Sequence, residues 1–338
     1  MRARRRPRRV LWVVVALLVV LALTALSTLV TPWPGALLVR YVFHRDAAAT
    51  TGALEAHAPE RIGALLDQQY REGDDDAYLD VYFPTDVEGT DRTLPTVIWT
   101  HGGAWISGTR KNYAGYYQLL ADAGYTVVSV DYTLGPEATY PTAVHQLLDA
   151  HAYVLAHAGR LHVDPDRIVL AGDSAGAQLS SQLAAIATDA DVARRVGVTS
   201  VLRPEQLRGV VLNCGIYDVP AMAGSGLVGW GVEQSLWAYT GERDFASSEA
   251  AAQMSTLHHV TGDFPPTYVS GGNGDPLTDG QSKPLAARLT ELGVDVTTHF
   301  FPADHQPALP HEYQFDLDTA DGPVALQKTL GFLRTHTG

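Results

Sequence analysis

Short runs of apolar residues alternate with amphipathic segments along most of the chain from Ala77 onward. The runs have the length and the Val and Ile content of buried strands, and the segments between them have helical periodicity. Strands are expected at residues 78–83, 96–100, 126–130, 167–171, 209–213, 267–270 and 294–301, and helices at 112–123, 140–157, 175–188 and 324–334. Because runs that are apolar throughout suit strands covered on both faces, the alternation predicts an α/β fold with a mostly parallel sheet between helices.

One catalytic domain, residues 77–338, accounts for this alternation. The chain of 338 residues is 46% hydrophobic and 18% charged, which is the composition of a folded enzyme. Two segments do not fit the pattern. Residues 31–76 are expected to form a linker and an N-terminal cap, mainly helical over 36–75. Residues from about 215 to 262 contain several aromatic side chains and are expected to form a cap over the site.

The N-terminus carries a candidate membrane segment. Residues 10–30 are 21 residues without a charge, which as a helix would span roughly 31 Å. Six Arg lie in residues 1–9, which predicts a basic tip on the cytoplasmic side. We therefore expect residues 10–30 to be a single-pass signal-anchor that holds the protein in the cell membrane, with the catalytic domain extracytoplasmic. The alternative is a cleaved signal peptide and a secreted protein, but the apolar part of such a peptide is usually about 7–15 residues long.

Charge argues against nucleic-acid binding. The net charge is −13, and without the six N-terminal Arg the remainder carries about −19. A body this acidic repels phosphate backbones, so no nucleic-acid partner is expected.

The most specific motif is Gly172-Asp-Ser-Ala-Gly176, which lies between a predicted strand (RIVLA) and a predicted helix (AQLSSQLAAIAT). A strained turn from strand to helix presents the Ser174 hydroxyl, and glycines are needed where the two backbones nearly touch. The N-terminus of the helix also favours the negative charge that develops in acyl transfer. Ser174 is therefore the candidate nucleophile.

A second motif, His101-Gly-Gly-Ala-Trp105, follows the predicted strand TVIWT. Adjacent glycines let backbone N–H groups point inward, and such groups bind the oxyanion of acyl transfer. We expect the oxyanion hole to consist of the N–H groups of Gly102, Gly103 and Ala175. His101 suits a role in bracing this loop better than a role as base.

A serine nucleophile needs a histidine base and an acid that orients it. Where the serine lies on such a strand-to-helix turn, the order along the chain is serine, acid, histidine. Asp275, after the strand TYVS, is the favoured acid, and Asp279 is the alternative. His311 is the favoured base because aromatic residues follow it in His-Glu-Tyr-Gln-Phe315, and His305 is the alternative.

No metal or other cofactor is expected. The pair His258-His259 lacks further ligands at metal-type spacing. Cys214 is the only cysteine, so an internal disulfide is impossible, and its apolar surroundings in sequence predict a buried thiol.

Together these motifs resemble those of the hormone-sensitive-lipase-like carboxylesterases of the α/β-hydrolase superfamily. The resemblance covers roughly residues 77–335 and rests on four motifs in the family's order: H-G-G-A-W at 101–105, D-Y-T-L-G-P-E at 131–137 followed by Tyr140-Pro141, G-D-S-A-G at 172–176, and D-P-L at 275–277. It implies the α/β-hydrolase fold, cleavage of carboxylic esters, often of short acyl chains, by a Ser/Asp/His triad without a cofactor, and a structural role for Glu137 beside the site.

The chain departs from the family in two places. Ala104 stands where many members have a third glycine, and the family's His-Gly-Phe after the last strand is missing. The interval from Asp275 favours His305, whereas the interval to Phe332 favours His311, so both remain open.

The sequence therefore predicts a serine carboxylesterase acting on a small-molecule ester. Related alternatives are a lipase, an arylformamidase, a peptidase and a carbohydrate deacetylase, and a different class is a binding protein that has lost the chemistry. Residues 36–43 (ALLVRYVF) fit either core packing or lipid contact, and core packing is the preferred interpretation.

Overall fold

The structure is a computed structural model, and it describes residues 6–224 and 226–338, with the side chains of all of these except 6–9, 227 and 228. The side chains of the basic tip expected at residues 1–9 therefore all lie outside the described part of the structure. A single eight-stranded sheet forms the centre of the molecule. Its strands are β1 (Ile62–Gln69), β2 (Tyr78–Pro84), β3 (Leu94–Thr100), β4 (Thr126–Val130), β5 (Val163–Asp173), β6 (Leu207–Asn213), β7 (Thr267–Gly271) and β8 (Val296–Phe300).

The strand order is β1-β2-β4-β3-β5-β6-β7-β8. The β1–β2 and β2–β4 pairs are antiparallel, and all other pairs are parallel. The predicted α/β-hydrolase fold with a mostly parallel sheet is confirmed. The prediction of helix over residues 36–75 is wrong for Ile62–Gln69, which form β1 through their pairing with β2. The sheet thus begins before Ala77, because a partner strand stabilises a segment whose own pattern is ambiguous.

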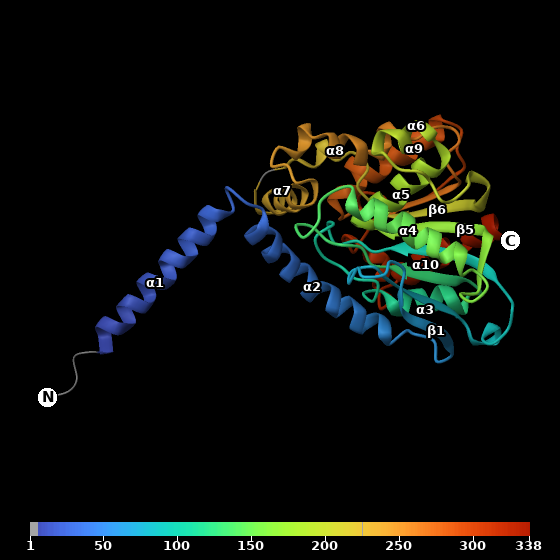
Figure 1. The fold of residues 1–338 in the computed structure, drawn as a ribbon, viewed down its shortest axis with the longest axis horizontal. Helices are drawn as coiled ribbons and strands as arrows, with labels where there is room; N and C mark the ends of the chain where they lie inside the picture. Colours follow the sequence, from blue (N-terminus) through green and yellow to red (C-terminus); the bar gives the residue numbers. More distant parts are fainter. Residues whose placement is uncertain (1–5, 225) are drawn as a thin grey trace.

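Helices cover both faces of the sheet (Figure 1). They are α1 (Arg6–Ser27), α2 (Trp33–Glu55), α3 (Ala114–Asp122), α4 (Thr142–Ala156), α5 (Ser174–Thr188), α6 (Ala190–Val196), α7 (Gly226–Thr240), α8 (Glu249–Met254), α9 (Lys283–Glu291) and α10 (Asp321–Thr337). Alternate strand residues face opposite cores: Ile98 and Leu170 pack with α4, α5 and α9, whereas Val97 and Val169 pack with α3 and α10. This alternation explains why the strands read as apolar throughout.

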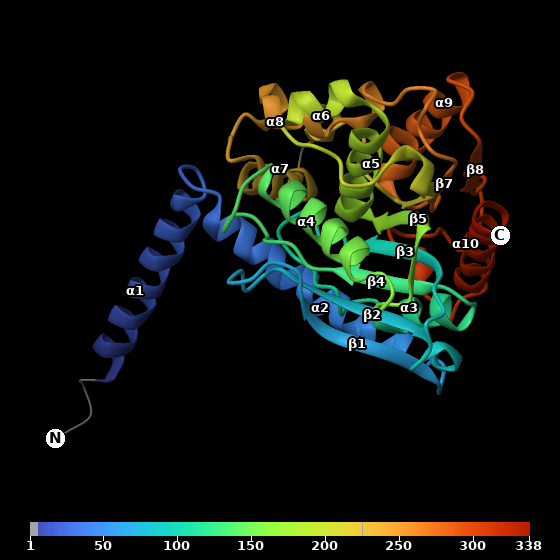
Figure 2. The ribbon, with the colours of Figure 1, turned by 45° about the vertical axis from the view of Figure 1, so that its right-hand side comes forward.

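Two segments lie over one end of the sheet. Residues 215–262, between β6 and β7, contain α7 and α8, and Trp237 and Tyr239 within α7 are buried. Helix α2 packs against α7 and α3, as Figure 2 also shows. These two segments, which were expected to form a cap, pack against each other.

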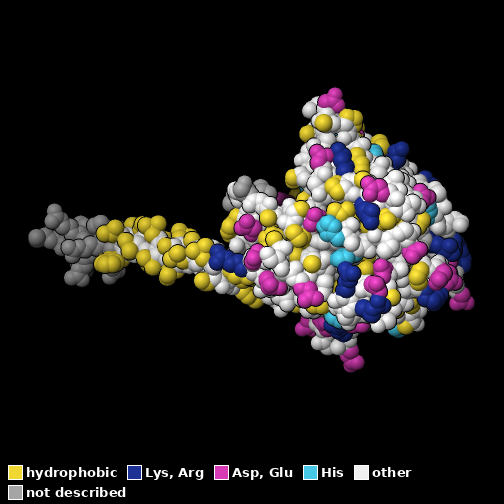
Figure 3. All heavy atoms as spheres, turned by 90° about the horizontal axis from the view of Figure 1, so that it is seen from above, with side chains coloured by type: hydrophobic (Ala, Val, Ile, Leu, Met, Phe, Trp, Pro, Cys, Tyr) yellow, Lys and Arg dark blue, Asp and Glu magenta, His cyan; other side chains and the backbone are white. Residues whose placement is uncertain are grey.

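Helix α1 is separate from this body. It projects away from the domain as a rod of apolar side chains (Figures 1 and 3). Val10–Ser27 is long and apolar enough to cross a membrane, and none of it is buried.

Candidate active site

Ser174 lies at the tip of a tight turn between β5 and α5. Its φ is 50°, in the left-handed region that a residue with a Cβ adopts only at a cost, and 7% of its surface is exposed. A Cβ on Gly172 would lie 2.5 Å from the carbonyl carbon of Gly176, and a Cβ on Gly176 would lie 2.0 Å from the Thr100 carbonyl oxygen. The close approach of backbones therefore requires both glycines.

The loop after β3 lies directly beside this turn. Gly103 has a φ of 103°, and a Cβ on it would lie 2.3 Å from the carbonyl oxygen of Ser107. The Gly102 N–H donates to Oδ2 of Asp173 at 2.9 Å, and this commitment to a buried carboxylate argues against Gly102 as an oxyanion donor. Ala175 is the second residue of α5, where N–H groups have no acceptor within the helix.

His101 braces the loop after β3. Its Nδ1 lies 2.8 Å from the Gly102 carbonyl oxygen, and its ring stacks on Tyr132 at a centroid distance of 4.5 Å. The Tyr132 hydroxyl donates in turn to the His101 carbonyl oxygen at 3.1 Å. Burial lowers the pKa of His101, so a neutral ring is favoured. These contacts fit a structural role.

The structure joins Asp275 to His311. Oδ2 of Asp275 lies 2.9 Å from Nδ1 of His311, the carboxylate is fully buried, and 36% of the imidazole is exposed. The alternative base, His305, instead has its Nε2 3.0 Å from Oδ2 of Asp321. The alternative acid, Asp279, is exposed and bound to Lys283 at 2.6 Å.

These groups meet at the carboxyl ends of three neighbouring parallel strands. Asp173 at the end of β5 pairs with Asn213 at the end of β6, so Ser174 and Cys214 directly follow neighbouring strand ends. The Cys214 sulfur, the Asp275 carboxylate and the His311 imidazole lie within 4.8 Å of one another. Serine and imidazole therefore occupy the same edge of the sheet.

Among the described residues, Cys214, Asp275 and His311 are the group close enough to share a metal ion. The hydrogen bond between His311 and Asp275 already joins two of its members. Burial raises the pKa of Cys214, which disfavours the thiolate that a metal requires. We therefore interpret the group as the surroundings of a base. Cys214 is buried, as predicted, but its place beside the imidazole was not expected.

Glu312 is a site residue that the sequence analysis missed. Its Oε1 lies 3.8 Å from Nε2 of His311, and its Oε2 accepts a hydrogen bond of 3.0 Å from the Tyr113 hydroxyl. Its φ is 62°, in the left-handed region that favours glycine. The departure from the expected His-Gly-Phe was the available indication, since it places a carboxylate where the resemblance implies a glycine.

The carboxylates change how neighbouring groups titrate. Partial burial acts to lower the pKa of His311, but the Cys214 sulfur, the hydrogen bond to Asp275 and the charge of Glu312 raise it well above its ordinary value. Because Cys214 is a neutral thiol near pH 7, we attribute the rise to the two carboxylates. Burial also raises the pKa of Asp173 well above its usual range, and the nearby charge of Glu312 raises it further.

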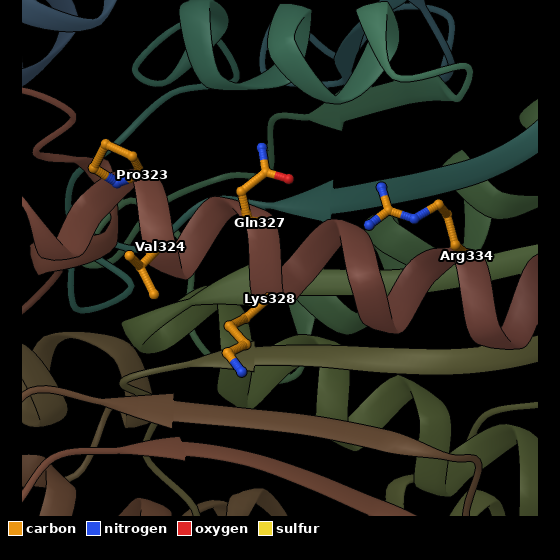
Figure 4. Close-up of a pocket in the computed structure, with 5 residues that line it drawn as sticks. All are labelled: Pro323, Val324, Gln327, Lys328 and Arg334. Atoms are coloured by element: carbon orange, nitrogen blue, oxygen red, sulfur yellow. The ribbon is translucent and has the colours of Figure 1, made fainter.

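A hollow elsewhere on the surface has no such chemistry. It lies along α10, and side chains of that helix line it, as Figure 4 shows: Pro323, Val324, Gln327, Lys328 and Arg334. None of these residues belongs to the edge that carries Ser174 and His311.

Comparison with known proteins agrees with this geometry. The family profile described as the α/β-hydrolase fold matches residues 97–308. Esterase LipI of Mycobacterium tuberculosis is 31% identical over 214 residues, which are 61% of this chain and 62% of that protein. An esterase of Gibberella moniliformis is 27% identical over 244 residues, 70% of this chain and 72% of its own length. The chain thus spans less than two thirds of the length of esterase LipI.

Solved structures share the architecture. Esterase B from Lactobacillus rhamnosis has a TM-score of 0.78 at 24% identity, over 90% of this chain and 96% of that one. An esterase from Pyrobaculum calidifontis has a TM-score of 0.68 at 23% identity, over 89% of this chain and 93% of that one. From its profile match, its motifs and its sheet, the chain belongs to the α/β-hydrolase family, in the hormone-sensitive-lipase-like carboxylesterase group.

Proposed function

We propose that this protein is a serine carboxylesterase with Ser174 as nucleophile, His311 as base and Asp275 as the acid that orients the base. One observation carries the proposal: a strained serine turn and a hydrogen-bonded Asp275–His311 pair meet at the same edge of the sheet. This combination is the requirement for acyl transfer by a serine.

In the proposed reaction, His311 accepts the proton of the Ser174 hydroxyl as Oγ attacks the ester carbonyl. The N–H groups of Gly103 and Ala175 bind the oxyanion that forms. The buried carboxylate of Asp275 holds Nδ1–H and stabilises the imidazolium, which then protonates the departing alcohol. Water attacks the acyl-enzyme by the same route and releases the acid.

Short-chain carboxylic esters are the proposed substrates, on the strength of the family motifs. A panel of p-nitrophenyl esters of increasing acyl length, an arylformamide and an acetylated sugar separates this activity from those of a lipase, an arylformamidase and a deacetylase. Fastest turnover of a short ester supports the proposal, and a preference for the amide or the sugar contradicts it.

Labelling with a fluorophosphonate tests the nucleophile directly. We expect the wild-type chain to react and Ser174→Ala to remain unlabelled, with its kcat lowered about 10⁴-fold or more. Residual turnover above about 1% of wild type in a folded variant would rule out Ser174.

We further propose that α1 anchors the enzyme in the cell membrane, with its N-terminus cytoplasmic and the catalytic domain outside. The length of the unburied apolar helix and the Arg block before it support this arrangement. Fractionation of expressing cells tests it: a full-length chain in the membrane fraction supports the anchor, and a shortened soluble chain indicates a cleaved signal peptide.

A further inference from the structure

The outward side of α2 carries large apolar side chains that are about half exposed to solvent. Trp33, Leu37 and Tyr41 follow one another at four-residue intervals and are 44%, 46% and 62% exposed, and beside them Leu38 and Val42 are 55% and 46% exposed. The prediction of core packing for residues 36–43 is therefore wrong for Leu37, Leu38, Tyr41, Val42 and Phe43, which are all exposed. We call Trp33, Leu37, Leu38, Tyr41 and Val42 the outer face of α2.

The opposite side of α2 is also apolar, and it is buried. Ala36 packs with Ile106 and Ala238, and a Cβ on Gly35 would lie 2.3 Å from the Gln234 side chain of α7. The first two turns of α2, residues 33–39, are thus apolar on both sides, which is characteristic of a helix whose two sides both lie out of water. The body covers one side, so the other needs a second apolar environment.

The position of α2 indicates what that environment is. Residues 28–32 are all that separates it from the end of α1, and α1 projects away while α2 turns across the body (Figures 1 and 2). The Arg243 side chain donates to the Leu29 carbonyl oxygen at 2.7 Å, which fixes this elbow to the cap. If α1 crosses a bilayer, as proposed above, α2 therefore starts at the bilayer surface.

Side-chain chemistry agrees with this position. Trp and Tyr, at positions 33 and 41, are the residue types that concentrate at the level of lipid headgroups. Arg45 is exposed one helical turn beyond Tyr41 and can pair with lipid phosphate. The rest of the body is acidic, so it offers no attraction of its own to such a surface.

We propose that α2 is an interfacial helix, whose outer face lies in the headgroup region of the phospholipid bilayer that α1 spans. The inner side of the same helix holds the oxyanion loop: Arg40 donates to the Ile106 carbonyl oxygen at 2.5 Å and binds Glu137 at 2.6 Å. The enzyme is thereby held with the catalytic loop next to the membrane, where it meets esters dissolved in the lipid surface.

Single-cysteine labelling of the full-length chain tests the contact. The native Cys214 is buried, so Leu37→Cys and Tyr41→Cys direct a fluorescent label to the outer face, and Val324→Cys on α10, which is 44% exposed, is the matched control. In nanodiscs of phosphatidylcholine and phosphatidylglycerol with brominated acyl chains, we expect strong quenching at 37 and 41 and little at 324. Equal quenching at all three positions overturns the proposal, and so does a cross-link between two Tyr41→Cys chains without quenching, which identifies a second copy as the occupant.

Ester hydrolysis gives a second readout, and this one rests on the proposed esterase function. The double variant Leu37→Gln/Tyr41→Gln should hydrolyse a soluble short ester at the wild-type rate, and a lipid-dissolved ester in vesicles about tenfold more slowly. Equal rates on the vesicle ester overturn the proposed role of the outer face. An inactive wild-type chain with lipid-quenched labels contradicts the esterase proposal alone.

Discussion

The serine turn (residues 172–176) and the histidine loop (residues 301–320) lie at the same edge of the sheet but are held by different contacts. In the serine turn, backbone meets backbone, as the 2.0 Å between a Cβ on Gly176 and the Thr100 oxygen shows. The histidine loop also has a backbone contact, from the Gly274 N–H to the Leu309 carbonyl oxygen at 2.8 Å, but side chains position its imidazole: Asn273 accepts from the Leu309 N–H at 2.9 Å, and Asp275 holds His311.

This difference decides what each region tolerates. A turn made of touching backbones admits only glycine at the points of contact, so its sequence is nearly fixed. A loop in which side chains position the imidazole admits more combinations of residues and spacings that place the ring equally well. Substitutions should therefore damage folding in the serine turn and chemistry in the histidine loop.

The largest expected effect is on catalysis in the histidine loop. His311→Ala removes the proposed base and should lower kcat about 10⁴-fold, whereas His305→Ala, which loses a pairing with Asp321 and a ring contact with Phe301, should change kcat less than about threefold. Steady-state hydrolysis of p-nitrophenyl acetate measures both. Wild-type turnover by His311→Ala together with a dead His305→Ala would exchange the two assignments.

The second effect is on folding in the serine turn. Gly176→Ala places a Cβ against two backbone oxygens that cannot move aside, and should destabilise the domain by about 3 kcal/mol or more. Gly331→Ala in α10 is the control, since a Cβ there meets nothing within 4 Å and should stabilise the helix by up to about 1 kcal/mol. Urea unfolding of both variants in detergent measures the contrast, and equal stabilities would contradict it.

The same difference explains what the sequence could predict. Strands and helices around the serine turn were predicted to within a few residues because buried strands read as continuous apolar runs, and 126–130 matches β4 at both ends. The strand β1 was missed because its exposed edge carries polar residues, and pairing with β2 decides its conformation.

Within the candidate site, glycine motifs indicated the proposed nucleophile but not every oxyanion donor. The Gly-Gly pair indicated where N–H groups converge, yet the capture of the Gly102 N–H by Asp173 depends on a side-chain position 71 residues away. Likewise, no spacing rule could choose between His305 and His311, since the choice lies in the partners Asp321 and Asp275.

A smaller effect concerns the pH dependence of kcat/KM, which the histidine loop should set. The base must be neutral to accept the Ser174 proton, so kcat/KM rises with pH through the pKa of His311. The charge of Glu312 favours the imidazolium and raises that pKa, so Glu312→Gln should move the acid limb of kcat/KM to lower pH. Glu88→Gln, exposed beyond the far end of β2, is the control and should leave the limb in place. A shift to higher pH would contradict the role of this charge.

The smallest expected effect is on stability, and it separates the contribution of the backbone conformation at residue 312 from that of the Glu312 side chain. Glu312→Gly and Glu312→Ala both remove the carboxylate and its hydrogen bond to Tyr113, so they differ only in how well they accept a φ of 62°. Glycine accepts it freely, and we expect the Gly variant to be more stable than the Ala variant by about 1 kcal/mol. At Gln327, exposed in α10, the same pair of substitutions should have the opposite order by about the same amount, because there glycine weakens a helix. Thermal unfolding of the four variants measures both differences. If Ala were the more stable at both positions, residue 312 would not hold the left-handed conformation.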